Sequence, residues 1–101
     1  MKQTDIILEY LHQRDIKNKA VRSQSYTIAI QARDNERKKA REFYNLVNNC
    51  EDETFNHIKY EQFLKEWFEK KYNLNIYEVD SIQVFKMINR NKNLNNLLNG
   101  I

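Results

Sequence analysis

Residues 54–72 read TFNHIKYEQFLKEWFEKKY, and no other part of the chain shows so regular a pattern. Large apolar side chains recur there at helical spacing, with charged residues on the opposite face. The apolar positions form an aromatic stripe of Tyr60, Phe63, Leu64, Trp67, Phe68 and Tyr72. Stripes of this spacing belong to a core far more often than to a binding platform. The pattern therefore predicts a long helix at the centre of the hydrophobic core.

The composition around this helix favours further helices. The chain has no proline and a single glycine, which disfavours β-sandwiches with tight hairpins and glycine-rich phosphate loops. Its fourteen asparagines suit the left-handed positions at helix ends. Apolar periodicity predicts helices near residues 4–14, 33–49 and 80–88, and residues 15–25 either extend the first of these or interrupt it. We therefore expect an all-α fold, a compact bundle of about four helices, with residues 1–101 forming a single domain.

Two segments leave a mixed fold open. Residues 26–30, YTIAI, alternate like a short strand, although the first and last of them also lie one helical turn apart. Residues 76–88 fit either a short hairpin or a helix, because Asp80-x-x-Gln83 resembles a capping box. If both segments are strands, the order of elements becomes that of a winged helix. The alternative to the bundle is thus a winged-helix-like α+β fold with a short hairpin at 76–88.

A basic segment lies upstream of the core helix. Residues 31–42, QARDNERKKARE, contain no large apolar side chain. Arg33, Arg37 and Arg41 recur there at four-residue spacing, so on a helix they form one ridge, with Lys38 beside it. Arginine offers a planar fork of donors that matches phosphate oxygens, and one arginine per turn can follow a nucleic-acid backbone. The spacing predicts a nucleic-acid-binding surface.

The same segment holds two amides and three acids. Gln31 and Asn35 are the candidates for contacting bases, because amide side chains pair with adenine edges. The opposing interpretation is a solvated helix whose cations are balanced by the neighbouring acids Asp34, Glu36 and Glu42. Under either interpretation we expect the segment to face solvent or an anionic partner, since a fold gains nothing by burying it.

Charge is unevenly distributed along the chain. Residues 14–41 hold nine Lys and Arg against three Asp and Glu, a balance of +6. Residues 42–80 hold four against nine, a balance of −5. Such blocks give a molecule a basic face and an acidic face, unless helices of opposite charge pack together and neutralise each other.

The C-terminal segment, residues 89–101, is rich in asparagine but keeps a helical apolar pattern. Its apolar positions are Leu94, Leu97, Leu98 and Ile101. Asparagine lowers helix propensity because its side chain competes for backbone hydrogen bonds, so a helix of this kind needs a surface to dock on. The segment either completes the bundle or forms a contact with a partner protein or with a second copy in a homodimer.

No catalytic, cofactor or metal site is readable in the sequence. Cys50 and His57 match no zinc spacing, and the carboxylates between them work against a reactive thiolate. Those three adjacent acids, residues 51–53, suit a charged turn better than a cation site, because adjacent side chains point in different directions. We expect a protein that is not an enzyme and that carries neither cofactor nor metal.

The expected location is the cytoplasm, without a membrane partner. A single cysteine indicates a reducing compartment, and the charged N-terminal residues do not resemble a signal peptide. No apolar run approaches the roughly 20 residues that a membrane span needs.

The function that these features favour is that of a small nucleic-acid-binding regulator of the kind that phages and mobile elements encode, with the helix face 33–41 on the phosphate backbone. The alternative is a protein-docking inhibitor or adaptor that uses the same charged face and the C-terminal amphipathic segment.

Overall fold

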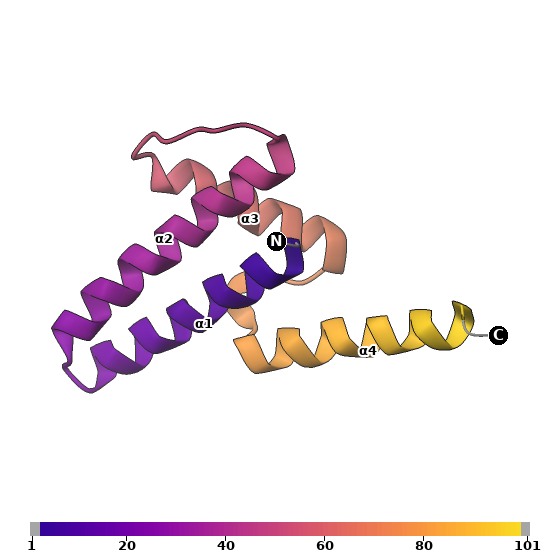
Figure 1. Cartoon of the computed structure of the whole chain (residues 1–101). Coiled ribbons are helices and arrows are strands. Elements are labelled where there is room, and N and C mark those ends of the chain that lie inside the picture. The colour runs from indigo at the N-terminus through magenta and orange to yellow at the C-terminus, as the bar shows by residue number, and fades with distance from the viewer. Residues whose placement is uncertain (1–2, 100–101) are drawn as a thin grey trace.

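The computed structural model describes the backbone of residues 3–99 and the side chains of residues 3–90. Its elements are α1 (Gln3–Arg22), α2 (Tyr26–Asn48), α3 (His57–Tyr72), a 3₁₀ turn η1 (Ile76–Glu78) and α4 (Ser81–Asn99), arranged as in Figure 1. No strand occurs in residues 3–99. The predicted all-α bundle of about four helices is confirmed, and the winged-helix alternative is not needed.

α1 and α2 form an antiparallel hairpin joined by residues 23–25 (Figure 1). Gln24 takes the left-handed conformation at the turn, with φ of 60°. The two ambiguous regions before the basic segment are both helical: residues 15–22 extend α1, and residues 26–30 open α2. Small buried side chains line the contact between the two helices, so their backbones can approach closely: Ala20, Ala29, Ala32 and Ala40.

The expectation that residues 31–42 gain nothing from burial is wrong for one side of the segment. Ala32, Glu36 and Ala40 recur at four-residue spacing and are buried against α1. Glu36 is only 4% exposed, and its carboxylate accepts a hydrogen bond from Lys17 of α1 at 2.6 Å. A charged residue can be buried here because a partner from another helix compensates for the loss of water.

α3 supplies the centre of the core, as its sequence pattern predicts. Tyr60, Leu64 and Phe68 are buried, and the other three residues of the aromatic stripe pack against them partly exposed. Phe43 of α2 is fully buried, with its ring centroid 4.9 Å from that of Trp67 in an edge-to-face arrangement. The core therefore lies away from the turn between α1 and α2, where α3 crosses the C-terminal part of α2.

The ends of the helices follow local rules. Asn49 and Asn73 end α2 and α3 in the left-handed conformation, which asparagine tolerates best after glycine. Before α4, the backbone N–H of Gln83 donates to Asp80 Oδ1 at 2.7 Å, and the N–H of Asp80 donates to Gln83 Oε1 at 3.0 Å. This reciprocal pair is the predicted capping box.

α4 packs through its first turns only and then extends away from the other helices (Figure 1). Val84 and Ile88 are buried in the core, together with Ile76 of η1. Leu94, Leu97 and Leu98 belong to the extending part of the helix, where only the backbone is described, and Ile101 lies outside the described residues. Their predicted role as a partner or dimer contact stays a prediction.

Candidate nucleic-acid interface

The basic ridge lies on α2 at successive turns. Arg33 and Lys38 are exposed, and Arg37 and Arg41 are partly buried. Because one side of α2 faces α1, the cations stand on the remaining surface of the helix. We call Arg33, Arg37, Lys38 and Arg41 the α2 ridge.

The acids of the same helix leave most of the α2 ridge unpaired. Glu36 pairs with Lys17 of α1, and Glu42 pairs with Lys39 at 3.0 Å. Lys39 also contacts Glu9 of α1 at 2.8 Å. Asp34 alone reaches the ridge, where it lies 3.5 Å from Arg33.

Within the described residues, Arg37, Lys38 and Arg41 therefore have no carboxylate within the 4 Å of an ion pair. The interpretation in which Asp34, Glu36 and Glu42 balance the cations holds for one arginine only. The described ion pairs also do not join the α2 ridge to any carboxylate of the acidic block at residues 42–80, so that block does not neutralise the ridge by pairing.

The structure separates the two amides from the arginines. Gln31 and Asn35 line a shallow cavity of about 320 Å³ between α1 and α2, whereas Arg33 and Arg37 line a different one. The Gln31 amide donates to Asn35 Oδ1 at 3.3 Å, and Asn35 donates to Gln13 Oε1 of α1 at 3.3 Å. Asn35 is thus engaged in the contact between the two helices.

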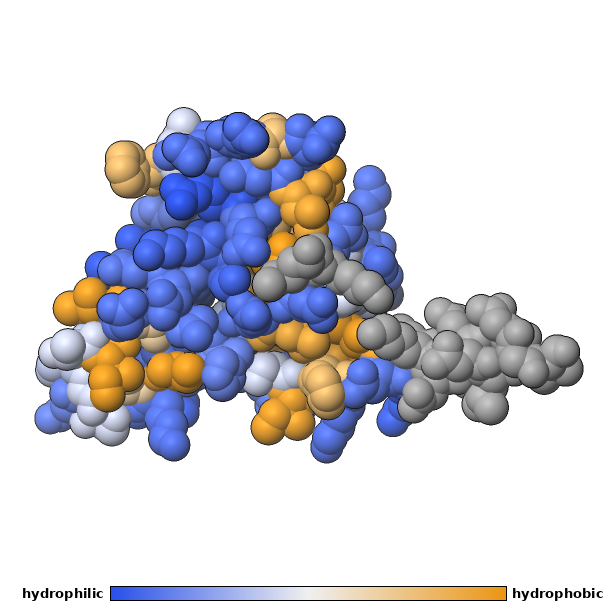
Figure 2. Space-filling model, viewed as in Figure 1, coloured by the Kyte–Doolittle hydropathy of each residue, from blue (hydrophilic) through white to orange (hydrophobic). Residues whose placement is uncertain are grey.

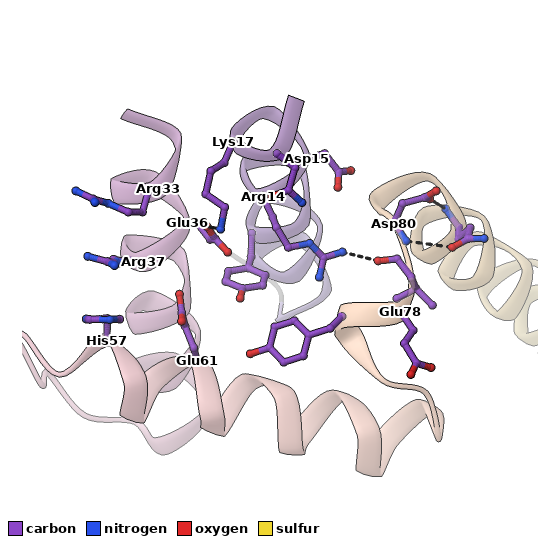
Figure 3. Close-up of a pocket in the computed structure, with 15 residues that line it drawn as sticks. Arg14, Asp15, Lys17, Arg33, Glu36, Arg37, His57, Glu61, Glu78 and Asp80 are labelled. Carbon is purple, nitrogen blue, oxygen red and sulfur yellow. Dashed lines mark hydrogen bonds and ion pairs between the residues drawn. The ribbon is translucent and has the colours of Figure 1, made fainter. Parts of the chain in front are cut away.

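A polar pocket of about 810 Å³ opens beside the ridge, where α1, α2, the start of α3 and the turn before α4 meet (Figure 3). Arg14 of α1 is 8% exposed and donates to the backbone carbonyls of Ile76, at 2.6 Å, and Val79. These bonds tie η1 to α1 and hold the far wall in place. Sequence reasoning missed Arg14, since its acceptors lie more than sixty residues away in the chain.

On the side of this pocket formed by α2 and the start of α3, cations and carboxylates lie at different depths, whereas Arg14 and Lys17 of α1 lie further in. Figure 3 shows Arg33, Arg37 and His57 one below another on its outer side, with Glu36 and Glu61 further in. The pKa of Glu61 is raised by its partial burial and then by the charge of Glu36, and His57, Lys17 and Arg37 act in the opposite direction. Sequence analysis did not single out Glu36 or Glu61 as site residues, because nothing local marks them.

The loop before α3 is structural. Asn45 organises it by donating to the Asp52 carbonyl at 2.9 Å and accepting from the Asp52 N–H at 3.1 Å. Lys59, at 2.7 Å, and the Thr54 N–H hold the pKa of Asp52 well below its usual range. Cys50 is exposed, and no group of three potential metal ligands occurs in the described part of the chain. His57 lines the polar pocket, whereas the Cys50 thiol donates to Asn45 Oδ1 at 3.4 Å.

Several large apolar side chains stay exposed (Figure 2). One group lies near the turn of the helical hairpin and comprises Val21, Tyr26, Ile28 and Ile30. A second comprises Phe55, which is 97% exposed, and Ile58. A third, Ile82 and Phe85, borders a groove of about 250 Å³ between α1 and α4 with Leu8 and His12.

No protein-family model, curated protein or solved structure matches this chain. None of the helices in residues 3–99 combines the length and the hydropathy that crossing a membrane requires.

Proposed function

We propose that this chain is a small non-enzymatic nucleic-acid-binding regulator whose α2 ridge contacts the phosphate backbone. The observation that carries the proposal is the absence of carboxylate partners around Arg37, Lys38 and Arg41 among the described residues, although acids are abundant nearby. Cations left unpaired by their own fold are available to an anionic partner.

The geometry of the ridge supports a phosphate contact. Three arginines at successive turns of one long helix present planar donor forks about 6 Å apart along the axis, close to the spacing of successive phosphates. The cations Lys86 and Arg90 on α4 are exposed and can assist. A regulator of phage or mobile-element type that acts in the cytoplasm fits the small size and the single cysteine.

The test is a titration of labelled duplex and single-stranded oligonucleotides at several salt concentrations. The variant Arg33→Gln/Arg37→Gln/Arg41→Gln keeps helix propensity nearly level, so its thermal melt should resemble that of the wild type. Its affinity should fall for every sequence. The slope of log affinity against log salt should become shallower by about 0.9 for each phosphate of duplex DNA that the variant no longer neutralises.

The matched control removes the same number of charges elsewhere. Lys19, Lys65 and Lys70 make no ion pair within the described residues and lie off the ridge. Their replacement by glutamine should lower affinity much less. A ridge variant that folds and binds as tightly as the control variant would overturn the proposal.

A second candidate function is that of a protein-docking inhibitor or adaptor. The observation that favours it is the exposure of Phe55 and Ile58, neighbouring apolar residues at the start of α3 that the core does not use. The same titration separates the two functions, because an adaptor would show no salt-dependent affinity for any oligonucleotide.

A further inference from the structure

The polar pocket adjoins the α2 ridge, since Arg33 and Arg37 belong to both. On the wall formed by α2 and the start of α3, cations lie outside and carboxylates lie further in. Arg33, Arg37 and His57 line its outer side, and the carboxylates of Glu36 and Glu61 lie further in (Figure 3). A phosphate is attracted to Arg33 and Arg37 and repelled from Glu36 and Glu61, so a ligand that spans this wall is anionic at one end only.

Glu61 is a half-buried carboxylate of the pocket that the described residues leave without a partner. It is half-buried, and within the described residues its carboxylate has no hydrogen bond or ion pair with another side chain. Glu36 differs, because Lys17 already satisfies it at 2.6 Å. A carboxylate held in a pocket without a donor is an acceptor available to a ligand.

Tyr77 provides an apolar wall in the same pocket. Its side chain is 54% exposed although it lines the cavity. Its backbone is held on both sides, because Arg14 binds the carbonyls of Ile76 and Val79. The N–H of Tyr77 also donates to Asn75 Oδ1 at 3.0 Å. A fixed, exposed aromatic ring beside cations is the arrangement that stacks unpaired bases.

We propose that the pocket receives one unpaired base of a single-stranded nucleic acid, preferentially guanine, with the flanking phosphate on Arg33 and Arg37, the base against Tyr77 and its pairing edge on Glu61. This inference rests on the proposed nucleic-acid-binding function and names its substrate class. A volume of about 810 Å³ lies within the range of small-ligand pockets and exceeds the need of one base.

The preference for guanine follows from donor and acceptor positions. An ionised carboxylate only accepts, so it matches an edge that carries two neighbouring donors. Guanine offers N1–H and the N2 amino group side by side on its pairing edge. Adenine and cytosine place an acceptor next to their donor, and thymine has one donor between two acceptors. In a duplex the pairing edge is occupied, which excludes duplex from the pocket.

The test measures the affinity of labelled oligothymidine in which one central thymine is replaced by guanine or by inosine, which lacks the N2 amino group. The guanine oligonucleotide should bind about tenfold more tightly than oligothymidine, with inosine in between. Glu61→Gln should bring the three affinities together, while Glu69→Gln on the exposed side of the same helix should preserve their order. Tyr77→Leu should weaken single-strand binding about tenfold and leave duplex binding unchanged, whereas Phe55→Leu should alter neither.

Equal affinities for the three oligonucleotides, together with wild-type single-strand binding by Tyr77→Leu, would overturn this inference. The proposed function would then still stand if the α2-ridge variant loses duplex affinity. If the wild-type protein binds no oligonucleotide at all, the proposed function fails, and the inference fails with it. Thermal melts of each variant check folding, which exposed Tyr77 and half-buried Glu61 should leave intact.

Discussion

The two halves of α2 contact the rest of the molecule in different ways. The first half, residues 26–38, packs on α1 through Ala29, Ala32 and Glu36, and it leaves Ile28 more than half exposed. The second half brings Ala40 and Phe43 into the aromatic core under α3. One helix thus joins a region buried through small and charged side chains to a densely apolar one.

This difference between the two halves of α2 indicates that the second half contributes most of the helix's stability, while the first half carries most of the proposed binding surface. Alanines bury little apolar surface, so the first half contributes little to stability by the hydrophobic effect. It remains helical because the second half anchors it and because elongating an existing helix costs less than nucleating one. Its outer surface carries Arg37 and Lys38, which make no ion pair within the described residues.

The largest expected effect is that of removing the Phe43 ring. Replacing this residue with alanine should lower the free energy of unfolding by about 3–5 kcal/mol, because the ring is fully buried against Phe63 and Trp67. Ile28→Ala in the first half should change it by less than about 0.5 kcal/mol. Urea denaturation measures both. Comparable decreases for the two variants would contradict the contrast and show that the surface around Ile28, near the turn of the hairpin, is covered in solution.

A smaller effect should follow the removal of the ion pair within the first half. Glu36→Ala should cost about 1–2 kcal/mol, because it leaves the Lys17 ammonium in a partly buried position. The cost stays below that of a fully buried pair, since the Lys17 side chain is 28% exposed and can turn towards water. Asp34→Ala, which removes an exposed pair on the same helix, is the control and should cost less than about 0.5 kcal/mol. Equal costs would show that burial of Glu36 has no energetic consequence.

The smallest effect concerns Glu61 and is seen in its pH dependence. Folding raises the pKa of Glu61, because burial and the charge of Glu36 disfavour the ionised form. Its contribution to stability is therefore fully present below the ordinary glutamate pKa and is lost as the pH rises through the raised value. Glu61→Gln should consequently remove a fall in stability over that range and be the more stable protein at neutral pH. Urea midpoints of both proteins from about pH 4 to about pH 7 test this. A difference that does not change with pH would contradict it.

Features that depend on neighbouring residues were predictable. The stripe from Tyr60 to Tyr72 and the capping box of Asp80 and Gln83 both appear as the sequence indicates. Helical hydrogen bonds and caps join residues three or four apart, so a short stretch of sequence is enough to predict them. Residues 26–30, like residues 15–25 and 76–88, were left open by the sequence; the alternation of 26–30 fits both periodicities, and only packing on α1 selects the helix.

In the candidate site, too, some features follow from the local sequence and others depend on the tertiary structure. The sequence by itself determined that arginines would recur along one side of a helix, because four-residue spacing is a property of the chain. Tertiary structure alone decided which charges remain unpaired. Lys17 pairs with Glu36, which lies nineteen residues further along the chain, and Arg14 donates to the carbonyls of residues that lie 62 and 65 positions away. The physical reason is that burying a charge depends on a partner at a few ångströms, and that partner comes from whichever element the fold brings there. The polar pocket, with the unused carboxylate of Glu61, exists only where four such elements meet.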